Sequence, residues 1–517
     1  MDKSISTFLI RHRKKDTVSF HMPGHKGSRI FEKLGYSRFI SNMADFDITE
    51  IDGADNLFKP ESIIRETMNK YKEIYGSRET YLLVNGSTGG LIASIMTCAA
   101  RGEQVIMARN CHKSIFAGVE MAGAQPVYIK PELIENAGIT GEITKTEVAK
   151  AIRENPEAKV LILPSPNYYG ICSDIEAISK LCHDRNIILI VDQAHGAHLK
   201  PFENYLKNGL LPKSAESQGA DIVINSTHKT LCTFTQSAIL NVVNPEIDLD
   251  VLEGNLQKME SSSPSYLLMC SLDVNAEIIL KHGDELFKTW MNNLTFFYEK
   301  VSEIDGISVV RNNMLDFSKI NLDALCLGYD GYELEKHLTD AGIFPELTAG
   351  NLVMCMTGIG NDRSDFERLL DALETLESRS KSKYTSDREI PTSKKFLEKG
   401  TLKPESYLGK GITKSVISLN KETAGGKTKS LADIMRLNPD KTDIPRHKKS
   451  VKLEDAAGKV CALPIVPYPP GIPVICPGEK FTREIVDYLI DLYGRGEKII
   501  GISPEKKVSV GLDNSDD

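Results

Sequence analysis

The chain has 517 residues, 41% of them hydrophobic and 26% charged, with a formal net charge of −8. A chain of this length can bury large cores and is predicted to form two or three domains. Its charge balance excludes an overall bias towards nucleic acid, and no run reaches the ~20 apolar residues of a membrane span.

Cysteine usage and the N-terminus predict the compartment. The ten cysteines form no C-x-x-C pair, which favours reduced thiols. The short apolar patch near the N-terminus lacks the long h-region of a signal peptide. We therefore expect a cytoplasmic protein.

Residues 1–45 are predicted to form an amphipathic N-terminal arm, and residues 46–270 a large α/β domain. In the second segment, short apolar runs alternate with helical patterns, which is typical of a mainly parallel sheet with right-handed crossovers. The predicted strands are 80–84, 104–108, 125–129, 160–163, 187–191 and 221–224.

The first of these strands leads into a small polar turn that is a candidate phosphate site. Gly86, Ser87 and Thr88 lie in the turn NGSTGG, which precedes a helical pattern over 91–100. Backbone N–H groups at a helix start, the helix dipole and two hydroxyls can together hold a phosphate. An ordinary capped helix has the same pattern, so this signal is weak alone. The chain contains no G-x-x-x-x-G-K-[ST] sequence, which argues against a nucleoside triphosphate loop.

Two further strands end in groups that suit a carbonyl cofactor. Asp192 and His195 follow strand 187–191, and Lys229 follows strand 221–224. Ligands of open α/β sheets lie at such carboxyl ends. Pyridoxal phosphate (PLP) needs a lysine amine and a carboxylate for its pyridine nitrogen. Alone, Asp192 could be a helix N-cap or a metal ligand, and Lys229 a solvated lysine. Their combination with the phosphate-type turn favours PLP.

Motifs along nearly the whole chain resemble the Orn/Lys/Arg decarboxylase family, fold type I PLP enzymes that act on basic amino acids. In order they are 21–27 (HMPGHKG), 47–50 (DITE), 85–88 (NGST), 109–114 (RNCHKS), 192–196 (DQAHG), 226–229 (STHK), 468–473 (YPPGIP) and 477–479 (PGE). Because the match begins at His21, the chain resembles the short form, which lacks a receiver-like N-terminal domain.

The resemblance implies roles for individual residues. Lys229 would form the Schiff base with PLP, Asp192 would pair with the pyridine nitrogen, and His112 would stack on the ring. These three are the expected catalytic residues, and no metal is expected. The other expected cofactor contacts are Gly86, Ser87, Thr88, Ala194, His195, Ser226 and His228, with Ser262 reaching the phosphate across a subunit interface. His195 could equally orient Asp192.

The implied reaction is decarboxylation of arginine, lysine or ornithine to an amine of the polyamine pathway. The implied assembly is a homodimer or a dimer of dimers with the site at the subunit interface. Glu479 would bind the substrate, although it could instead favour the dipole of a helix predicted over 483–493. Two alternatives stay open: another fold type I reaction, such as that of an aminotransferase or lyase, and a non-catalytic regulator that binds PLP or an amine.

The remaining boundaries are predictions from composition. Residues 271–380 are predicted to form a smaller α/β domain, 381–452 a flexible polar connector, and 453–517 a C-terminal domain. Three positions depart from the family pattern: Gln193 replaces a usual glutamate, Asn167 replaces a usual threonine, and the stretch around Phe58 lacks a usual histidine.

Overall fold

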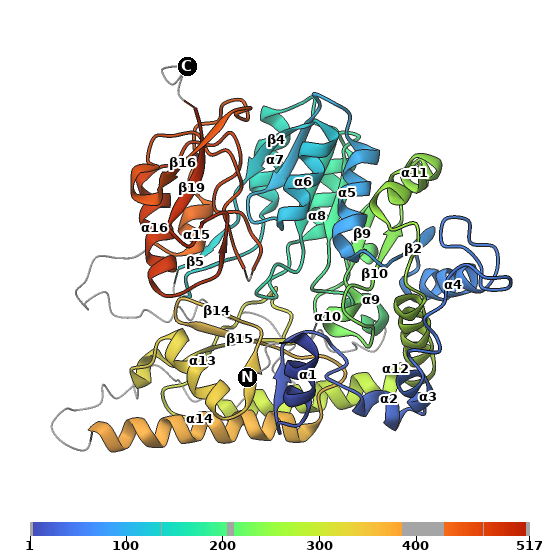
Figure 1. Ribbon diagram of the computed structural model, residues 1–517, viewed down its shortest axis with the longest axis vertical. Helices are drawn as coiled ribbons and strands as arrows, with labels where there is room; N and C mark the ends of the chain where they lie inside the picture. The colour runs from blue at the N-terminus through green and yellow to red at the C-terminus, as the bar shows by residue number, and fades with distance from the viewer. Residues whose placement is uncertain (1–3, 136, 204–210, 385–428, 469, 513–517) are drawn as a thin grey trace.

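The computed structural model describes residues 4–512, apart from 136, 204–210, 385–428 and 469. Figure 1 shows a large α/β domain in the upper centre, a smaller domain below it, and a C-terminal domain, in red, beside the large one. Among the described residues, no helix is long and apolar enough to cross a membrane.

The large domain is built on a seven-stranded sheet. Its strands, in spatial order, are β2 (Glu79–Leu83), β10 (Ala238–Val242), β9 (Ile222–Asn225), β8 (Ile188–Asp192), β7 (Val160–Pro164), β3 (Gln104–Ala108) and β4 (Gln125–Ile129). Only β10 runs antiparallel to the others. The predicted α/β class with a mainly parallel sheet is therefore confirmed.

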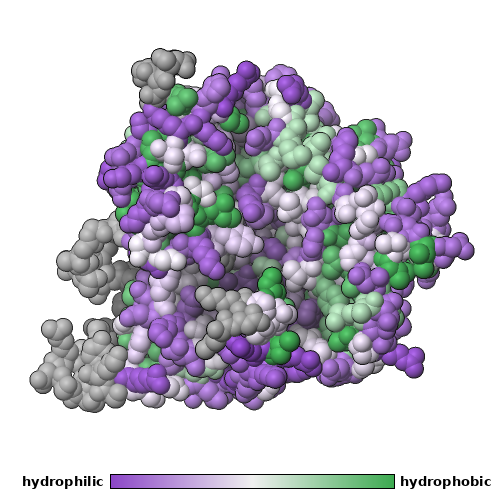
Figure 2. All heavy atoms as spheres, viewed as in Figure 1, coloured by the Kyte–Doolittle hydropathy of each residue, from purple (hydrophilic) through white to green (hydrophobic). Residues whose placement is uncertain are grey.

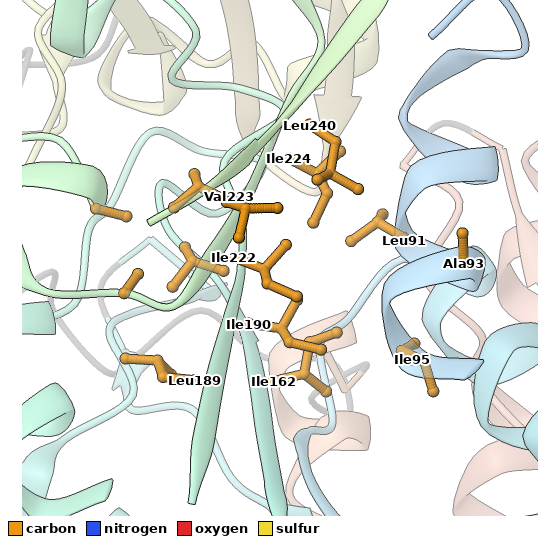
Figure 3. Close-up of a cluster of buried hydrophobic side chains, with 14 of the residues drawn as sticks. Leu91, Ala93, Ile95, Ile162, Leu189, Ile190, Ile222, Val223, Ile224 and Leu240 are labelled. Atoms are coloured by element: carbon orange, nitrogen blue, oxygen red, sulfur yellow. The ribbon is translucent and has the colours of Figure 1, made fainter. Parts of the chain in front are cut away.

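Helices cover both faces of this sheet, which explains why its central strands are continuous apolar runs. They are α4 (Ile63–Tyr75), α5 (Gly86–Cys98), α6 (Lys113–Ala122), α7 (Lys145–Glu154), α8 (Ile175–His183) and α11 (Leu249–Met259), joined by the short α9 (Leu199–Phe202), α10 (Thr227–Thr230), β5 (Leu133–Ile134) and β6 (Ile139–Thr140). Figure 3 shows Leu91 of α5 facing Ile224 and Ile190 of the sheet. A side chain at Gly90 would lie 2.5 Å from Leu83, so glycine permits this close packing.

The smaller domain combines an antiparallel sheet with long helices. The sheet order is β11 (Ser308–Val309), β12 (Lys319–Asp323), β15 (Leu352–Met356) and β14 (Leu347–Ala349). Its helices are α12 (Tyr266–Val301), which begins in the core of the large domain, α13 (Gly331–Asp340) and α14 (Arg363–Tyr384). Trp290, Phe297 and Phe366 form part of its buried core.

The N-terminal segment is divided between surface and core. No side chain of α1 (Ile5–Arg13) is buried. In contrast, β1 (Val18–Phe20) pairs in parallel with β13 (Ile343–Pro345), and Phe20 and Phe31 join the core of the smaller domain. The short helices α2 (Arg29–Lys33) and α3 (Ser37–Ser41) follow. Much of the predicted arm therefore belongs to the smaller domain.

The C-terminal domain begins earlier than the composition predicts. It contains α15 (Leu431–Met435), β16 (Lys448–Lys452), β17 (Val466–Pro467), α16 (Arg483–Gly494), β18 (Ile499–Ile500) and β19 (Lys507–Gly511). Strand β16 pairs with β19, and Met435 is buried in one cluster with Phe481. Residues 430–452 are thus part of this domain and not of a connector, whereas 385–428 lie outside the described residues. The predicted helix over 483–493 is present as α16.

Candidate functional site

The carboxyl ends of β2, β3, β7, β8 and β9 lie at one edge of the large sheet. The predicted turn with Ser87, the His112 loop, the Asp192 loop and the Lys229 loop follow four of these ends. Two hydrogen bonds join three of these segments: Ser226 Oγ donates to Ser87 Oγ at 2.9 Å, and Lys229 Nζ lies 2.9 Å from His195 Nε2. The charge of Lys229 also acts on the His112 ring. The structure therefore brings these predicted residues into one site.

Lys229 lies on the one-turn helix α10, directly after β9, and is partly buried. Burial lowers the pKa of its amine from 10.5 to about 8, although the carboxylates of Asp192 and Glu346 oppose this effect. An amine with such a pKa is partly neutral near physiological pH, and the neutral form is the nucleophile. Lys229 can therefore attack a carbonyl without first needing a strong base.

Asp192 is the last residue of β8, with an exposed fraction of 6%. One carboxylate oxygen accepts the backbone N–H of Ala194 at 3.1 Å. Burial raises the pKa of Asp192, whereas Lys229 and the Ala194 N–H act in the opposite direction. A buried carboxylate held in this way favours a cationic partner, because such a partner restores the charge balance lost on leaving water.

The start of α5 forms an anion cradle. Asn85 is the N-cap, but its side chain does not cap the helix; its Nδ2 donates instead to the carbonyl of Met259 at 2.7 Å. The first N–H groups of the helix therefore lack a side-chain cap, and the dipole adds positive potential there. The hydroxyl pair of Ser87 and Ser226 lies beside this helix start. These groups suit a phosphate.

His228 lies directly before Lys229 on α10. Its exposed fraction is 8%, and its Nδ1 donates to the carbonyl of Ser237 at 2.9 Å. Burial lowers the pKa of its imidazole to about 4, so the ring is neutral at physiological pH. The ring therefore fixes the turn that carries Lys229 without adding charge to it.

His112 is the N-cap of α6, and its Nδ1 accepts the N–H of Ser114 at 3.3 Å and lies 2.8 Å from the Ser114 hydroxyl. Burial, with the charge of Lys229, lowers the pKa of His112 to about 3. Gly471 covers the ring, because a Cβ at this positive-φ position would lie 3.0 Å from it. The result is a neutral, oriented ring of the kind that stacks on an aromatic cofactor.

His195 carries an unsatisfied polar atom. Burial, with the charge of Lys229, holds the pKa of its imidazole well below the ordinary value, so the neutral ring accepts from Lys229 through Nε2 and carries its proton on Nδ1. That Nδ1 is buried and has no hydrogen-bond partner among the described residues. An unpaired buried donor is costly, so this atom indicates a site for a ligand acceptor.

Glu346 and Tyr168 belong to the site, although no motif in the sequence indicated them. The Tyr168 hydroxyl donates to Glu346 Oε1 at 2.8 Å, and the backbone N–H of Met22 donates to Oε2 at 2.9 Å. The Tyr168 ring lies 4.5 Å from the ring of His195. Since Glu346 also raises the pKa of Lys229, a second carboxylate faces the reactive amine.

The N-terminal motif packs directly against the lysine-bearing helix. The N–H of Gly24 donates to the carbonyl of His228 at 2.7 Å, and a Cβ at Gly24 would lie 2.4 Å from the carbonyl carbon of Thr230. From the smaller domain, Gly360 approaches equally closely, because its Cβ would lie 2.3 Å from the carbonyl oxygen of His25. The spacing of the motif is thus explained by a three-way backbone contact.

Two predicted residues lie in other surroundings. Glu479, 1% exposed, accepts the N–H of Cys476 at 2.8 Å and pairs with Arg109 at 3.3 Å. Glu479 therefore pairs with a buried arginine and does not face an open channel. The N-cap of α16 is Thr482 and not Glu479. Ser262 is exposed on the turn between α11 and α12, and its contact with a second subunit stays a prediction.

One departure from the family pattern has a structural explanation. Asn167 is 3% exposed, and its Oδ1 accepts the N–H groups of Tyr169 and Ile171, both at 3.0 Å. Its Nδ2 donates to the carbonyl of Thr140 at 2.8 Å. Asn167 therefore shapes the turn that carries Tyr168.

Among the described residues, no group of three or more His, Cys, Asp or Glu could hold a metal ion.

Comparison with known proteins finds similarity along most of the chain. Residues 4–326 match the family model described as Orn/Lys/Arg decarboxylase, major domain, and residues 437–507 match the model of the C-terminal domain. Arginine decarboxylase of Bacillus subtilis (strain 168) is 28% identical over 505 residues, covering 96% of this chain and 94% of the relative. An uncharacterized protein of the same organism is 30% identical over 497 residues, covering 95% and 94%.

Solved structures show the same fold. Lysine decarboxylase A from Pseudomonas aeruginosa superposes with a TM-score of 0.71 at 20% identity, covering 98% of this chain and 80% of that chain. A structure of SPT with PLP has a TM-score of 0.53 at 11% identity, covering 71% of this chain and 87% of that one. The fold type I class predicted from sequence is confirmed.

Proposed function

The chain belongs to the Orn/Lys/Arg decarboxylase family and is an amino acid carboxy-lyase, and from that premise we propose that it decarboxylates a basic amino acid with PLP held on Lys229. The observation that carries the proposal is the pairing of a lysine amine, whose pKa is about 8, with a buried aspartate at the carboxyl edge of the sheet. Arginine is the first candidate substrate, because the relative at 28% identity is an arginine decarboxylase.

Four independent features support PLP as the cofactor. Lys229 supplies the amine, Asp192 a carboxylate for the pyridine nitrogen, the uncapped start of α5 a phosphate site, and His195 Nδ1 an unpaired donor. When bound, PLP supplies an electron sink for the electron pair left by departing CO₂. Asp192 would keep the ring nitrogen protonated, and His112 would cover one face of the ring.

The site's own groups also account for handling of the proton and the substrate. Lys229 is a better proton donor to the substrate carbon than His195, because its pKa is near neutrality and that of His195 is far lower. Glu346 is the carboxylate best suited to receive an ammonium or guanidinium group, because it acts on Lys229 and forms no ion pair among the described residues, whereas the charge of Glu479 is already balanced by Arg109. We therefore favour Glu346 over Glu479 as the residue that recognises the basic end of the substrate.

We propose a homodimer as the working assembly. The α1 helix exposes a row of apolar side chains, with Ile5, Phe8, Leu9 and Ile10 each more than half exposed, from 56% to 80%. Figure 2 shows further apolar surface gathered over the region where α5 and α6 lie in Figure 1. Apolar surface of this extent is typical of an interface. Ser262 would complete the phosphate site of the second subunit.

The proposal is tested by loading the purified chain with PLP and supplying arginine, ornithine and lysine in separate reactions. CO₂ and the product amine are measured together, with the variant Lys229→Ala as the control. The proposal predicts equal amounts of CO₂ and amine from one of the three substrates and none from the variant. Formation of a keto acid without CO₂ would assign the site to another reaction of the same fold, and PLP binding without any product would indicate a regulator.

A further inference from the structure

Gln193 is the residue directly after Asp192. A hydrogen bond from a backbone N–H group fixes the orientation of its side-chain amide. Its Oε1 accepts the N–H of Ala215 at 2.7 Å, and a backbone N–H can only donate. Its Nε2 must therefore point the other way, where it donates to Glu216 Oε2 at 2.8 Å and to Asn225 Oδ1 at 3.0 Å. Gln193 is 1% exposed, so these bonds do not exchange with water.

Glu216, on the short 3-10 helix η2 (Glu216–Gln218), closes this network. Its Oε1 accepts from Asn225 Nδ2 at 2.8 Å and from Asn241 Nδ2 at 2.9 Å, while its Oε2 accepts from Gln193. Three amide donors require an acceptor-only group, which a carboxylate is. Among the described residues, which exclude 204–210, Glu216 forms no ion pair, and its exposed fraction is 7%.

The network connects the ends of β8 and β9 that carry the site with the neighbouring strand β10. Gln193 continues β8 beyond Asp192, and Asn225 is the last residue of β9, four positions before Lys229. Asn241 lies on β10, where its Oδ1 accepts from Thr80 Oγ1 of β2 at 2.8 Å, and β2 leads into the phosphate turn. One carboxylate thus holds the segments that carry Asp192 and Lys229.

We propose that Glu216 is a positioning residue that sets the distance between Asp192 and Lys229 through Gln193 and Asn225. The catalytic role of Glu216 rests on the proposed function, whereas the network itself rests on the hydrogen bonds alone. It also explains why glutamine suits position 193: a glutamate there would bring two carboxylates together at 2.8 Å, and buried carboxylates at that distance cannot both ionise.

Three variants separate geometry from charge. Glu216→Gln places its new amide N–H group against Gln193 Nε2, so two donors face each other without an acceptor, and Gln193→Glu places two acids against each other. The double variant Q193E/E216Q reverses the pair: the new amide at position 216 would donate to the new carboxylate at position 193 and still accept from both asparagines. The bond from position 193 to Asn225 is lost, and a carboxylate oxygen faces Asn225 Oδ1 in its place. The matched control is Asp221→Asn, because Asp221 is also buried and accepts the N–H of Leu189 and the amide of Asn244, but at the opposite end of the same strands.

The first readout uses the chain without PLP. The rate at which Lys229 reacts with an amine-acylating reagent is measured against pH by peptide mass spectrometry. In Glu216→Gln the midpoint should rise towards 10.5, because a displaced lysine regains water. Loss of negative charge alone would lower the midpoint, so the sign separates positioning from a simple charge effect. The double variant and Asp221→Asn should both keep the midpoint of the unaltered chain.

The second readout is the affinity for PLP. Glu216→Gln should weaken it about tenfold, or ~1.4 kcal/mol, and the double variant should recover at least half of that loss on a logarithmic scale. An unmoved or lowered Lys229 midpoint in Glu216→Gln, or a double variant no better than Gln193→Glu, would overturn the proposal. If the unaltered chain fails to bind PLP, the proposed function fails, while the Lys229 midpoints still decide the role of Glu216.

Discussion

Replacing Lys229 by methionine should stabilise the PLP-free chain near pH 7. Methionine has a similar length and no charge, so it removes the cost of burying an ammonium group. A fall in pKa from 10.5 to about 8 corresponds to about 3 kcal/mol at 1.36 kcal/mol per pKa unit. Loss of the hydrogen bond to His195 costs about 1 kcal/mol. The expected net gain at pH 7 is therefore about 2 kcal/mol.

The gain should disappear at high pH, and its sign follows from proton binding. The folded-state pKa of Lys229 lies below its unfolded value, so between pH 8 and 10.5 the unfolded chain binds more protons than the folded one. The stability contribution of the lysine therefore improves as pH rises through this window. Near pH 10.5 the amine is neutral in the folded chain and half neutral in the unfolded chain, so the cost of burying the charge has nearly vanished and the variant should show no advantage.

Urea unfolding of the PLP-free chain at pH 7 and near pH 10.5 provides the assay. The control is Lys258→Met, at an exposed lysine of α11, which should change stability by less than about 0.5 kcal/mol at either pH. Equal stability of Lys229→Met and the unaltered chain at pH 7 would refute the reasoning. So would a gain that does not change with pH.

Three further substitutions test separate parts of the site. Asp192→Asn keeps the shape of the side chain but removes its charge, so PLP should still bind while the rate of CO₂ release falls on the order of 10²–10³-fold; an unchanged rate would remove Asp192 from the mechanism. Glu346→Gln should raise KM about 10- to 100-fold in steady-state assays, with little change in PLP affinity, because it removes a charged acceptor; an unchanged KM would show that another group recognises the substrate. Gly24→Ala places a Cβ 2.4 Å from the backbone of Thr230 and should cost about 1–3 kcal/mol of stability and most of the activity, whereas Gly254→Ala, with open space around it, should cost neither; equal losses in both would contradict the close contact.

The strands of the large sheet could be predicted because their signal is local. Residues 104–108 and 160–163 are predicted as strands and lie in β3 (Gln104–Ala108) and β7 (Val160–Pro164). Strands buried on both faces are continuous apolar runs, which are visible in a sequence. The antiparallel strand β10 was not predicted, because direction within a sheet depends on pairing with β2 and β9 and not on composition.

The site could be predicted where its residues directly follow strands. Asp192 ends β8 and Lys229 comes just after β9, and the order of the strands brings them together. Glu346 could not be predicted, because it reaches the site from the smaller domain through hydrogen bonds with Tyr168 and Met22, 178 and 324 positions away. No local pattern marks such a contact.

The C-terminal boundary was wrong for a related reason. Residues 430–452 are polar, and polar composition favours a connector. Yet β16 has an edge partner in β19, and the few apolar residues around Met435 suffice to place the segment in a core. Strand pairing between segments distant in sequence is a tertiary property, and it overrides the local composition.

The most direct test of the account is chemical trapping of the cofactor on the chain. The PLP-loaded protein is reduced with borohydride and digested, and the peptides are analysed by mass spectrometry. The account predicts a phosphopyridoxyl group on Lys229 alone, with none on the neighbouring Lys26 or Lys319. Modification of another lysine with Lys229 unmodified, or no modification of any peptide, would contradict it.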